Sequence, residues 1–83
     1  MPAYDYAALR RFEGKIVVIT VVGGEVIRAR ANSVFDEERG LLFDLIETNR
    51  PESYKRYPPG SGFVIPWEYI EDIREAPAEE AQV

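Results

Sequence analysis

The chain of 83 residues lacks both cysteine and histidine. Without cysteine no disulfide can form, and a zinc site built on thiolates and imidazoles is excluded. Nucleophilic catalysis by a Ser-His-Asp or Cys-His arrangement is excluded as well, because the histidine base is missing. No two acidic residues are bracketed by apolar segments as in a catalytic cleft, and the adjacent acids at 36–38 suit a solvated turn. We therefore expect no enzymatic activity, no cofactor and no metal site.

Long apolar runs are absent too. No segment approaches the roughly 20 residues that cross a membrane, and the Met-Pro-Ala-Tyr-Asp start lacks the pattern of a signal peptide. We expect a cytoplasmic protein that does not bind membranes. Because a typical domain has about 100–150 residues, the chain is expected to form a single small domain.

Negative charge is unevenly distributed along the chain. Residues 68–83 hold six carboxylates against the single cation Arg74, and this segment accounts for the whole net charge of −5. The rest of the chain is neutral, and eight of the ten basic residues are arginine. The acidic end repels phosphate, but it does not prevent a local basic face elsewhere.

The pattern of apolar residues predicts one short helix and five strands. Asp5 can cap a helix within residues 4–13, and Gly14 ends it. β-branched and alternating segments follow, with turns at residues 23–24 and 36–40. The predicted strands cover residues 15–22, 25–35, 41–48, 63–65 and 70–74.

Proline and glycine mark the remaining connections. Residues 49–62 hold three of the six prolines and two of the six glycines, which predicts a long loop. Pro66 ends the fourth strand because it has no amide hydrogen, and residues 67–69 form a 3₁₀ turn. Residues 75–83 are rich in alanine and glutamate and predict a disordered acidic tail. The fold class is all-β, a small five-stranded barrel over residues 1–74 with a short N-terminal helix.

Four segments in order carry a family resemblance. They are Leu9-x-x-Phe12-x-Gly14-Lys15-x-Val17-x-Ile19, Gly24-Glu25-x-Ile27-x-Ala29, Phe35-Asp36 and Leu41-Leu42-Phe43. Together they resemble the Sm-like (LSm) family of small barrels. The resemblance implies edge strands that pair between subunits to close a ring, often around RNA. The chain departs from the family's RNA pocket, because Arg39-Gly40 replaces the nucleotide-gripping asparagine and Pro66-Trp67-Glu68 replaces an Arg-Gly or Lys-Gly pair.

The two ends of the barrel sequence carry a second resemblance. Ala3-Tyr4-Asp5-Tyr6 and the segment 62–70, Gly-Phe-Val-Ile-Pro-Trp-Glu-Tyr-Ile, are similar to the opening and closing signatures of Src-homology-3 domains. Those signatures imply a groove for polyproline peptides. Here the groove, or alternatively an interface, would involve Tyr4, Tyr6, Pro66, Trp67 and Tyr69, with Trp67 better suited to a core or interface anchor. Both resemblances imply the same SH3-like or Sm-like barrel.

Strands with apolar residues on both faces predict self-association. One face of a small barrel normally meets water, yet residues 15–22 and 41–48 carry apolar side chains on both faces. We expect the excess to be covered by a second subunit or by the helix through Leu9 and Phe12. The residues concerned are Val17, Ile19, Val21, Leu42 and Ile46.

Two groups of residues are candidates for binding RNA or a partner. The loop group combines stacking rings with cations, a composition that holds single-stranded nucleic acid. Its alternative role is to fold back over the barrel mouth or an adjacent subunit. The strand group either binds phosphate or forms the solvated face of a half-buried sheet. The candidates are Arg50, Tyr54, Lys55, Arg56 and Tyr57 in the loop, and Arg28 and Arg30 on the strand.

The sequence favours a non-enzymatic binding or scaffolding module that forms a homo-oligomer, with an Sm-like ring as the expected assembly. An RNA-binding Sm-like protein is the alternative reading, and a polyproline-binding module is a weaker one. Because the usual Sm-like pocket residues are missing, RNA would have to be held by the 50–57 loop.

Overall fold

The computed structural model describes residues 4–58 and 61–76 of the chain. The helix α1 spans Tyr6–Arg10, and the Asp5 carboxylate accepts a hydrogen bond from an amide of its first turn, as the sequence predicts. Leu9 is completely buried. The helix is shorter than the predicted 4–13, because the chain tightens into turns before Gly14, which adopts a φ of 81°.

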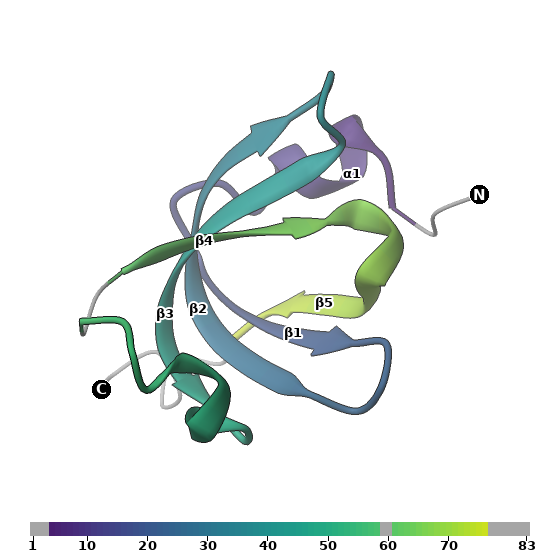
Figure 1. Cartoon of the computed structure of the whole chain (residues 1–83). Coiled ribbons are helices and arrows are strands. Elements are labelled where there is room, and N and C mark those ends of the chain that lie inside the picture. The colour runs from purple at the N-terminus through teal and green to yellow at the C-terminus, as the bar shows by residue number, and fades with distance from the viewer. Residues whose placement is uncertain (1–3, 59–60, 77–83) are drawn as a thin grey trace.

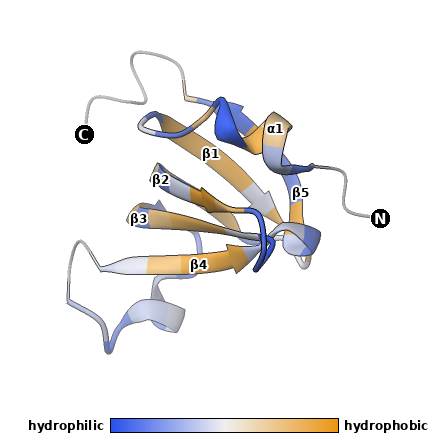
Figure 2. Ribbon diagram, turned by 90° about the horizontal axis from the view of Figure 1, so that it is seen from above, coloured by the Kyte–Doolittle hydropathy of each residue, from blue (hydrophilic) through white to orange (hydrophobic). Residues whose placement is uncertain are grey.

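Five strands form one antiparallel sheet in the order β4-β3-β2-β1-β5. The strands are β1 Ile16–Val21, β2 Val26–Phe35, β3 Gly40–Thr48, β4 Gly62–Pro66 and β5 Ile70–Glu75. Gly23 and Gly24 adopt φ values of 101° and 98° in the β1–β2 turn, conformations that glycine reaches without steric cost. The predicted all-β fold with five strands is confirmed. Figure 2 shows α1 beside β1 and β5 on one side of the barrel, with β4 on the opposite side.

Two 3₁₀ helices lie outside the strands. η2, Trp67–Tyr69, joins β4 to β5 and confirms the predicted turn. η1, Pro51–Tyr54, lies inside the segment predicted as a loop, so that part of the prediction is wrong. The proline and glycine content indicated a break in the sheet. Pro51 nevertheless suits the first position of a helical turn, because the amide hydrogen that proline lacks would have no partner at that position.

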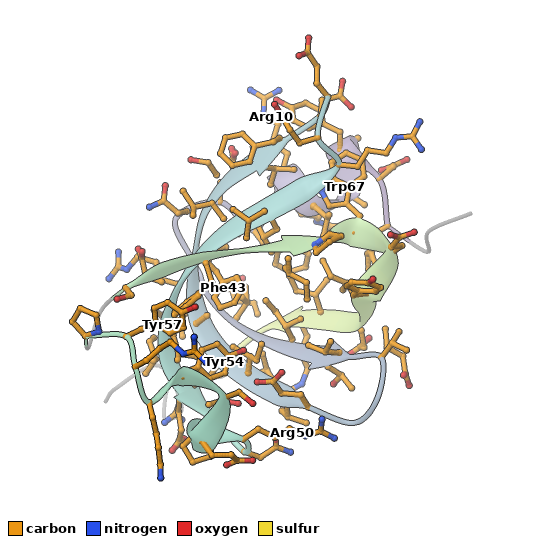
Figure 3. All side chains as sticks on the ribbon, in the orientation of Figure 1. Arg10, Phe43, Arg50, Tyr54, Tyr57 and Trp67 are labelled. Atoms are coloured by element: carbon orange, nitrogen blue, oxygen red, sulfur yellow. The ribbon has the colours of Figure 1, made fainter. Side chains whose placement is uncertain are left out.

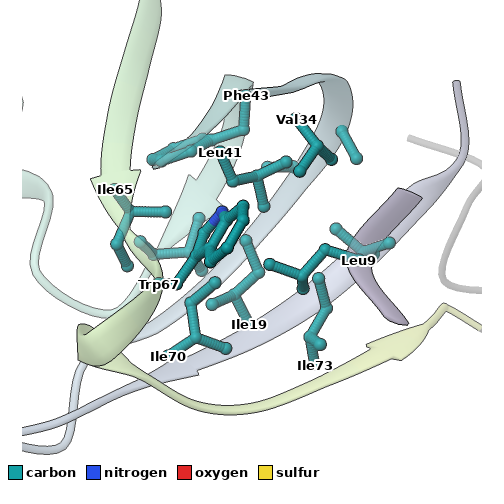
Figure 4. Packing of buried hydrophobic residues seen from close by; sticks show 13 residues of the cluster. Leu9, Ile19, Val34, Leu41, Phe43, Ile65, Trp67, Ile70 and Ile73 are labelled. Atoms are coloured by element: carbon teal, nitrogen blue, oxygen red, sulfur yellow. The ribbon is translucent and has the colours of Figure 1, made fainter. Parts of the chain in front are cut away.

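The hydrophobic core lies inside the curled sheet and includes residues from α1, all five strands and η2. Figure 4 shows Trp67 among the side chains of Leu41, Ile65 and Ile70. Trp67 is only 4% exposed, and it closes the core where the chain passes from β4 to β5. A single chain therefore contains a complete core, with Trp67 as its large aromatic member.

The apolar excess on β1 is covered within the chain. Val17 and Ile19 are completely buried in the same cluster as Leu9. The sequence predicted that either a second subunit or the helix through Leu9 covers these residues, and in the structure Leu9 packs in the same cluster. Val21 is half-buried against the core, and Leu42 and Ile46 of β3 are also half-buried. Val21, Leu42 and Ile46 therefore keep part of their surface exposed within the single chain.

The fold extends past the predicted boundary at residue 74. Glu75 pairs with Val17 in the ladder between β5 and β1, and Ala76 is buried. The amide of Ala76 donates to the carbonyl of Ile16 at 2.9 Å. The prediction that the tail begins at residue 75 is wrong, because the ladder continues through these two residues. Residues 77–83 of the predicted tail lie outside the described residues.

Gly40 marks a close approach between β3 and β4. A Cβ atom added to this buried glycine would lie 2.8 Å from Cγ1 of Val64. Gly40→Ala is therefore expected to lower the free energy of unfolding by about 1–3 kcal/mol, because the two strands must shift apart. Urea unfolding followed by circular dichroism measures this loss. The Gly40→Ala/Val64→Ala double variant should recover most of it, whereas a neutral Gly40→Ala would contradict the packing.

Candidate functional site

The predicted loop residues separate into packed rings and exposed cations. The rings of Tyr54 and Tyr57 meet Phe63 of β4 edge-on, with centroid distances of 5.0 and 5.1 Å. Figure 3 shows Tyr54 and Tyr57 gathered near Phe43 on one side of the barrel. Lys55 and Arg56 are exposed and form no hydrogen bond or ion pair with another described residue. The loop thus folds back over the sheet and uses its rings for packing.

Arg50 lies before η1 and connects the loop to the β1–β2 turn. Its guanidinium donates to the carbonyl of Gly23 at 2.6 Å, and its backbone amide donates to the Thr48 hydroxyl at 3.1 Å. The guanidinium bond holds the end of β3 against the neighbouring hairpin, and the amide bond fixes the turn that follows β3. This predicted binding residue therefore has a structural role in the chain.

Arg28 and Arg30 point to the outer face of β2, as the alternation predicts. Arg28 is largely buried and forms an ion pair of 2.9 Å with Glu47 of β3, beside a hollow of about 460 Å³. Arg30 is exposed and stands opposite Asp44 in the β2–β3 register. Because carboxylates face both arginines, this surface has the pattern of a solvated sheet face.

Tyr4 covers part of the outer edge of β5. Its hydroxyl donates to the carboxylate of Asp72 at 3.2 Å and accepts from the amide of Ile73 at 3.3 Å. An edge strand exposes such amides to any passing chain, so a side-chain hydroxyl that occupies one of them partly protects the edge.

The residues predicted for a peptide groove do not come together. Tyr6 packs against the core and lies beneath the guanidinium of Arg10, and Trp67 is part of the core itself. Pro66 shares one hollow with Trp67, and Pro66 and Tyr69 line a second, common pocket. Tyr4 and Tyr6 do not line that pocket, because Tyr4 bonds to β5 and Tyr6 belongs to α1.

That common pocket, which we call the Glu25 pocket, has a volume of about 270 Å³. It lies between the β1–β2 hairpin, η1, β4 and η2, and its lining includes Glu25, Phe43, Tyr54, Phe63, Pro66 and Tyr69. Sequence reasoning did not single out Glu25. The sequence does contain a feature that points to Glu25. The alternation that turns Ile27 and Ala29 inward also turns Glu25 toward the barrel interior.

Glu25 is held by two hydroxyl groups from distant parts of the chain. Its Oε2 atom accepts from Thr48 Oγ1 at 2.7 Å and from the Tyr54 hydroxyl at 2.9 Å. Burial raises the pKa of Tyr54 to about 12, and the hydrogen bond and negative charge of Glu25 act in the same direction. Tyr54 therefore stays a proton donor to Glu25 over the whole neutral range.

The raised pKa of Tyr54 predicts a loss of stability in alkali. The unfolded chain releases this proton near pH 10.0, whereas the folded chain keeps it to about pH 12. The contribution of Tyr54 is thus complete below about pH 10 and is lost as the pH rises toward 12. Urea unfolding of the native chain and of Tyr54→Phe across this range measures it. The two curves should converge with rising pH, and parallel curves would contradict the assignment.

Acidic residues are scattered over the part of the chain that the structure describes. No group of three or more histidine, cysteine, aspartate or glutamate side chains there could hold a metal ion. Among the same residues, no helix is long and apolar enough to cross a membrane. The chain matches no protein-family model, no curated protein and no solved structure.

Proposed function

We propose that the chain is a non-enzymatic scaffolding module that self-associates head to tail through the two edges of its sheet, closing into an Sm-like ring. One observation carries the proposal. The sheet ends in β4 on one side and β5 on the other, and among the described residues neither strand pairs with another strand on its outer side, although the Tyr4 hydroxyl bonds to one amide of β5. Figure 1 shows these two strands joined by η2 along the open side of the barrel. Unpaired edges are templates for pairing with another chain.

The free edge of β4 is short and uncharged. The amide of Trp67 and the carbonyl of Ser61 both bond to residues on the β3 side. Because backbone groups alternate along a strand, the amides of Gly62 and Val64 point away from β3. Pro66 is the next residue whose backbone nitrogen points away from β3. Its lack of an amide hydrogen therefore removes no hydrogen bond within the chain. Val64 is 57% exposed, so an arriving strand would meet an apolar side chain here.

The free edge of β5 has a different character. The amide of Ala76 bonds to β1, so the amides of Ile73 and Glu75 point outward. The Ile73 amide donates to the Tyr4 hydroxyl, which stands where the carbonyl of an added strand would lie. Glu71, Asp72 and Glu75 outnumber Arg74 and give this strand a net negative charge, although Glu75 forms an ion pair with Lys15. Pairing β5 of one copy with the uncharged β4 of the next avoids the repulsion between two acidic edges.

Two different edges on one subunit lead to a ring. Pairing of β4 with β5 of the next copy is a heterologous contact, in which each subunit keeps one free edge for another partner. Repetition closes into a ring when the rotation between copies permits it, and every edge is then paired. A scaffold of this kind needs no catalytic group, and the curled sheet supplies both contact strands.

The absence of cysteine allows each edge to be labelled separately. Copies carrying Val64→Cys are mixed with copies carrying Glu71→Cys and treated with a short bismaleimide. We expect cross-linked dimers in the mixture at a higher yield than in either variant alone. Val22→Cys, at an equally exposed valine in the β1–β2 turn, is the matched control for Val64→Cys. Cross-linking of Val64→Cys mainly to itself, or only at the level of the control, would overturn head-to-tail pairing.

RNA binding is the second candidate function, and the exposed side chains of Lys55 and Arg56 favour it. Other features oppose it. The rings of Tyr54 and Tyr57 are packed on Phe63 rather than free to stack on bases. A hollow of about 210 Å³ beside Arg39 and Trp67, where the Sm-like resemblance implies a nucleotide, is flanked by Glu38 and Glu68. These carboxylates repel phosphate.

We therefore expect weak or no binding of uridine-rich or adenine-rich oligonucleotides at physiological salt. The two loop cations Lys55 and Arg56 give a logarithmic salt slope of only about −1.4 for a single strand. Fluorescence anisotropy on the native chain and on Tyr54→Ala/Arg56→Ala decides the question. Sub-micromolar binding that the double variant abolishes would establish the RNA-binding function instead.

A further inference from the structure

The Glu25 pocket holds a carboxylate without a counter-ion. Glu25 is half-buried, and no lysine or arginine nitrogen among the described residues forms an ion pair with it. The basic group bonded to the same hairpin is Arg50, whose guanidinium is bound to the carbonyl of Gly23. Burying part of an ionised carboxylate is costly unless its charge is compensated. The pocket is therefore suited to a positively charged occupant.

The carboxylate is also oriented before any ligand arrives. Both hydroxyl donors, from Thr48 and Tyr54, bond to Oε2 of Glu25. A carboxylate has about four acceptor positions, so Oε1 keeps the capacity to face a ligand. The two hydroxyl groups fix the carboxyl plane, which lowers the entropy lost when a ligand binds.

Aromatic rings form much of the remaining wall. Phe43, Tyr54, Phe63 and Tyr69 line the pocket together with Glu25. Phe63 meets Tyr54 at an interplanar angle of 74° and Phe43 at 36°, so the three ring planes differ in orientation. Ring faces attract cations through their quadrupole, and recognition of quaternary ammonium groups is the principal functional use of this attraction.

The chemistry of the wall selects among cations. A hard metal ion requires six or more oxygen ligands for calcium and near-octahedral oxygens for magnesium, and one carboxylate with aromatic neighbours supplies neither. An alkylated ammonium group carries a diffuse charge under an apolar methyl surface, which matches rings and one carboxylate. A volume of about 270 Å³ lies just below the usual range for drug-sized ligands and is suited to such a head group.

We propose that the Glu25 pocket binds an alkylated ammonium group, with Glu25 as the counter-ion and Tyr54, Phe63 and Tyr69 as the aromatic contacts. The group can belong to a free quaternary amine or to a methylated lysine side chain, because both present the same head group. The inference is independent of ring formation, since every group that it names lies within one chain.

The test is an NMR titration of the full chain with tetramethylammonium chloride. We expect saturable chemical-shift changes at Thr48, Tyr54 and Phe63, with a dissociation constant in the low millimolar range. Sodium chloride at equal ionic strength and 3,3-dimethyl-1-butanol, the neutral isostere of choline, serve as controls. Choline and a trimethyllysine peptide are titrated in parallel. Tighter binding of the peptide assigns the head group to a polypeptide, and equal binding assigns it to a free amine.

Glu25→Gln removes the negative charge but keeps the size and shape of the side chain. Its amide oxygen still accepts hydrogen bonds from the hydroxyl groups of Thr48 and Tyr54. This variant should bind tetramethylammonium about tenfold more weakly or worse. Glu47→Gln, which removes an exposed carboxylate of the outer face, should bind like the native chain. Tyr69→Ala, a change at an exposed ring that leaves the core intact, should also weaken binding. Absence of saturable shifts, equal binding by Glu25→Gln, or equal binding of the neutral isostere would overturn the proposal.

Discussion

Replacing Trp67 with alanine is expected to lower the free energy of unfolding by about 3–5 kcal/mol. The side chain is 4% exposed and packs among core residues of β3, β4 and β5. A domain of this size has a total stability of about 4–12 kcal/mol, so the change removes a large share of it. Circular dichroism during urea unfolding measures the loss, since the variant has no tryptophan left to report by fluorescence.

Tyr69→Ala is the matched control for Trp67→Ala. Tyr69 lies in the same 3₁₀ helix, but its side chain is 52% exposed. Surface truncations of this kind usually change the stability by about 0.5 kcal/mol or less. If the two variants unfolded at the same urea concentration, Trp67 would not be the anchor of the core that the structure shows.

Val64→Asp is expected to weaken self-association by about 100-fold or more, because like charges placed against each other at an interface cost several kcal/mol. The new carboxylate would lie on the uncharged β4 edge, against the acidic β5 edge of the next copy. Natural proteins use charged residues on edge strands in the same way to prevent pairing. Sedimentation velocity over a concentration series measures the shift toward the single subunit.

Val22→Asp provides the comparison for Val64→Asp. The two valines are exposed to nearly the same extent, 58% and 57%, and the substitution adds the same charge. The amide of Val22 already bonds to the carbonyl of Tyr69, so this position offers no free edge. Val22→Asp should sediment like the native chain, and equal behaviour of the two variants would remove β4 from the interface.

The fold could be predicted because its determinants are local. The alternation through Ile27 and Ala29 gave the inner face of β2, and both residues are buried. The Gly23-Gly24 pair and the Asp5 cap marked a turn and a helix start from neighbouring residues alone. The sequence prediction missed the 3₁₀ helix η1 and ended the last strand one residue before Glu75. At both places the local composition is compatible with regular structure as well as with a loop.

The pocket could not be predicted in the same way, because it depends on contacts between distant segments. Glu25 and Tyr54 are 29 positions apart, and the fold of the 49–62 segment decides that they meet. Sequence composition left two roles open for Tyr54, stacking on RNA or folding back over the barrel, and in the structure its ring packs on Phe63 while its hydroxyl donates to Glu25. Trp67, which the sequence suited to a core or interface anchor, lies in the core.

The mass of the native chain in solution shows whether the sheet edges of different copies pair. Light scattering coupled to size-exclusion chromatography is carried out at tens of micromolar and after tenfold dilution. Ring formation predicts one species with a mass that is a whole multiple of 9.5 kDa and does not change on dilution. A species of 9.5 kDa at the higher concentration would show that both sheet edges stay unpaired, and it would contradict the proposed function.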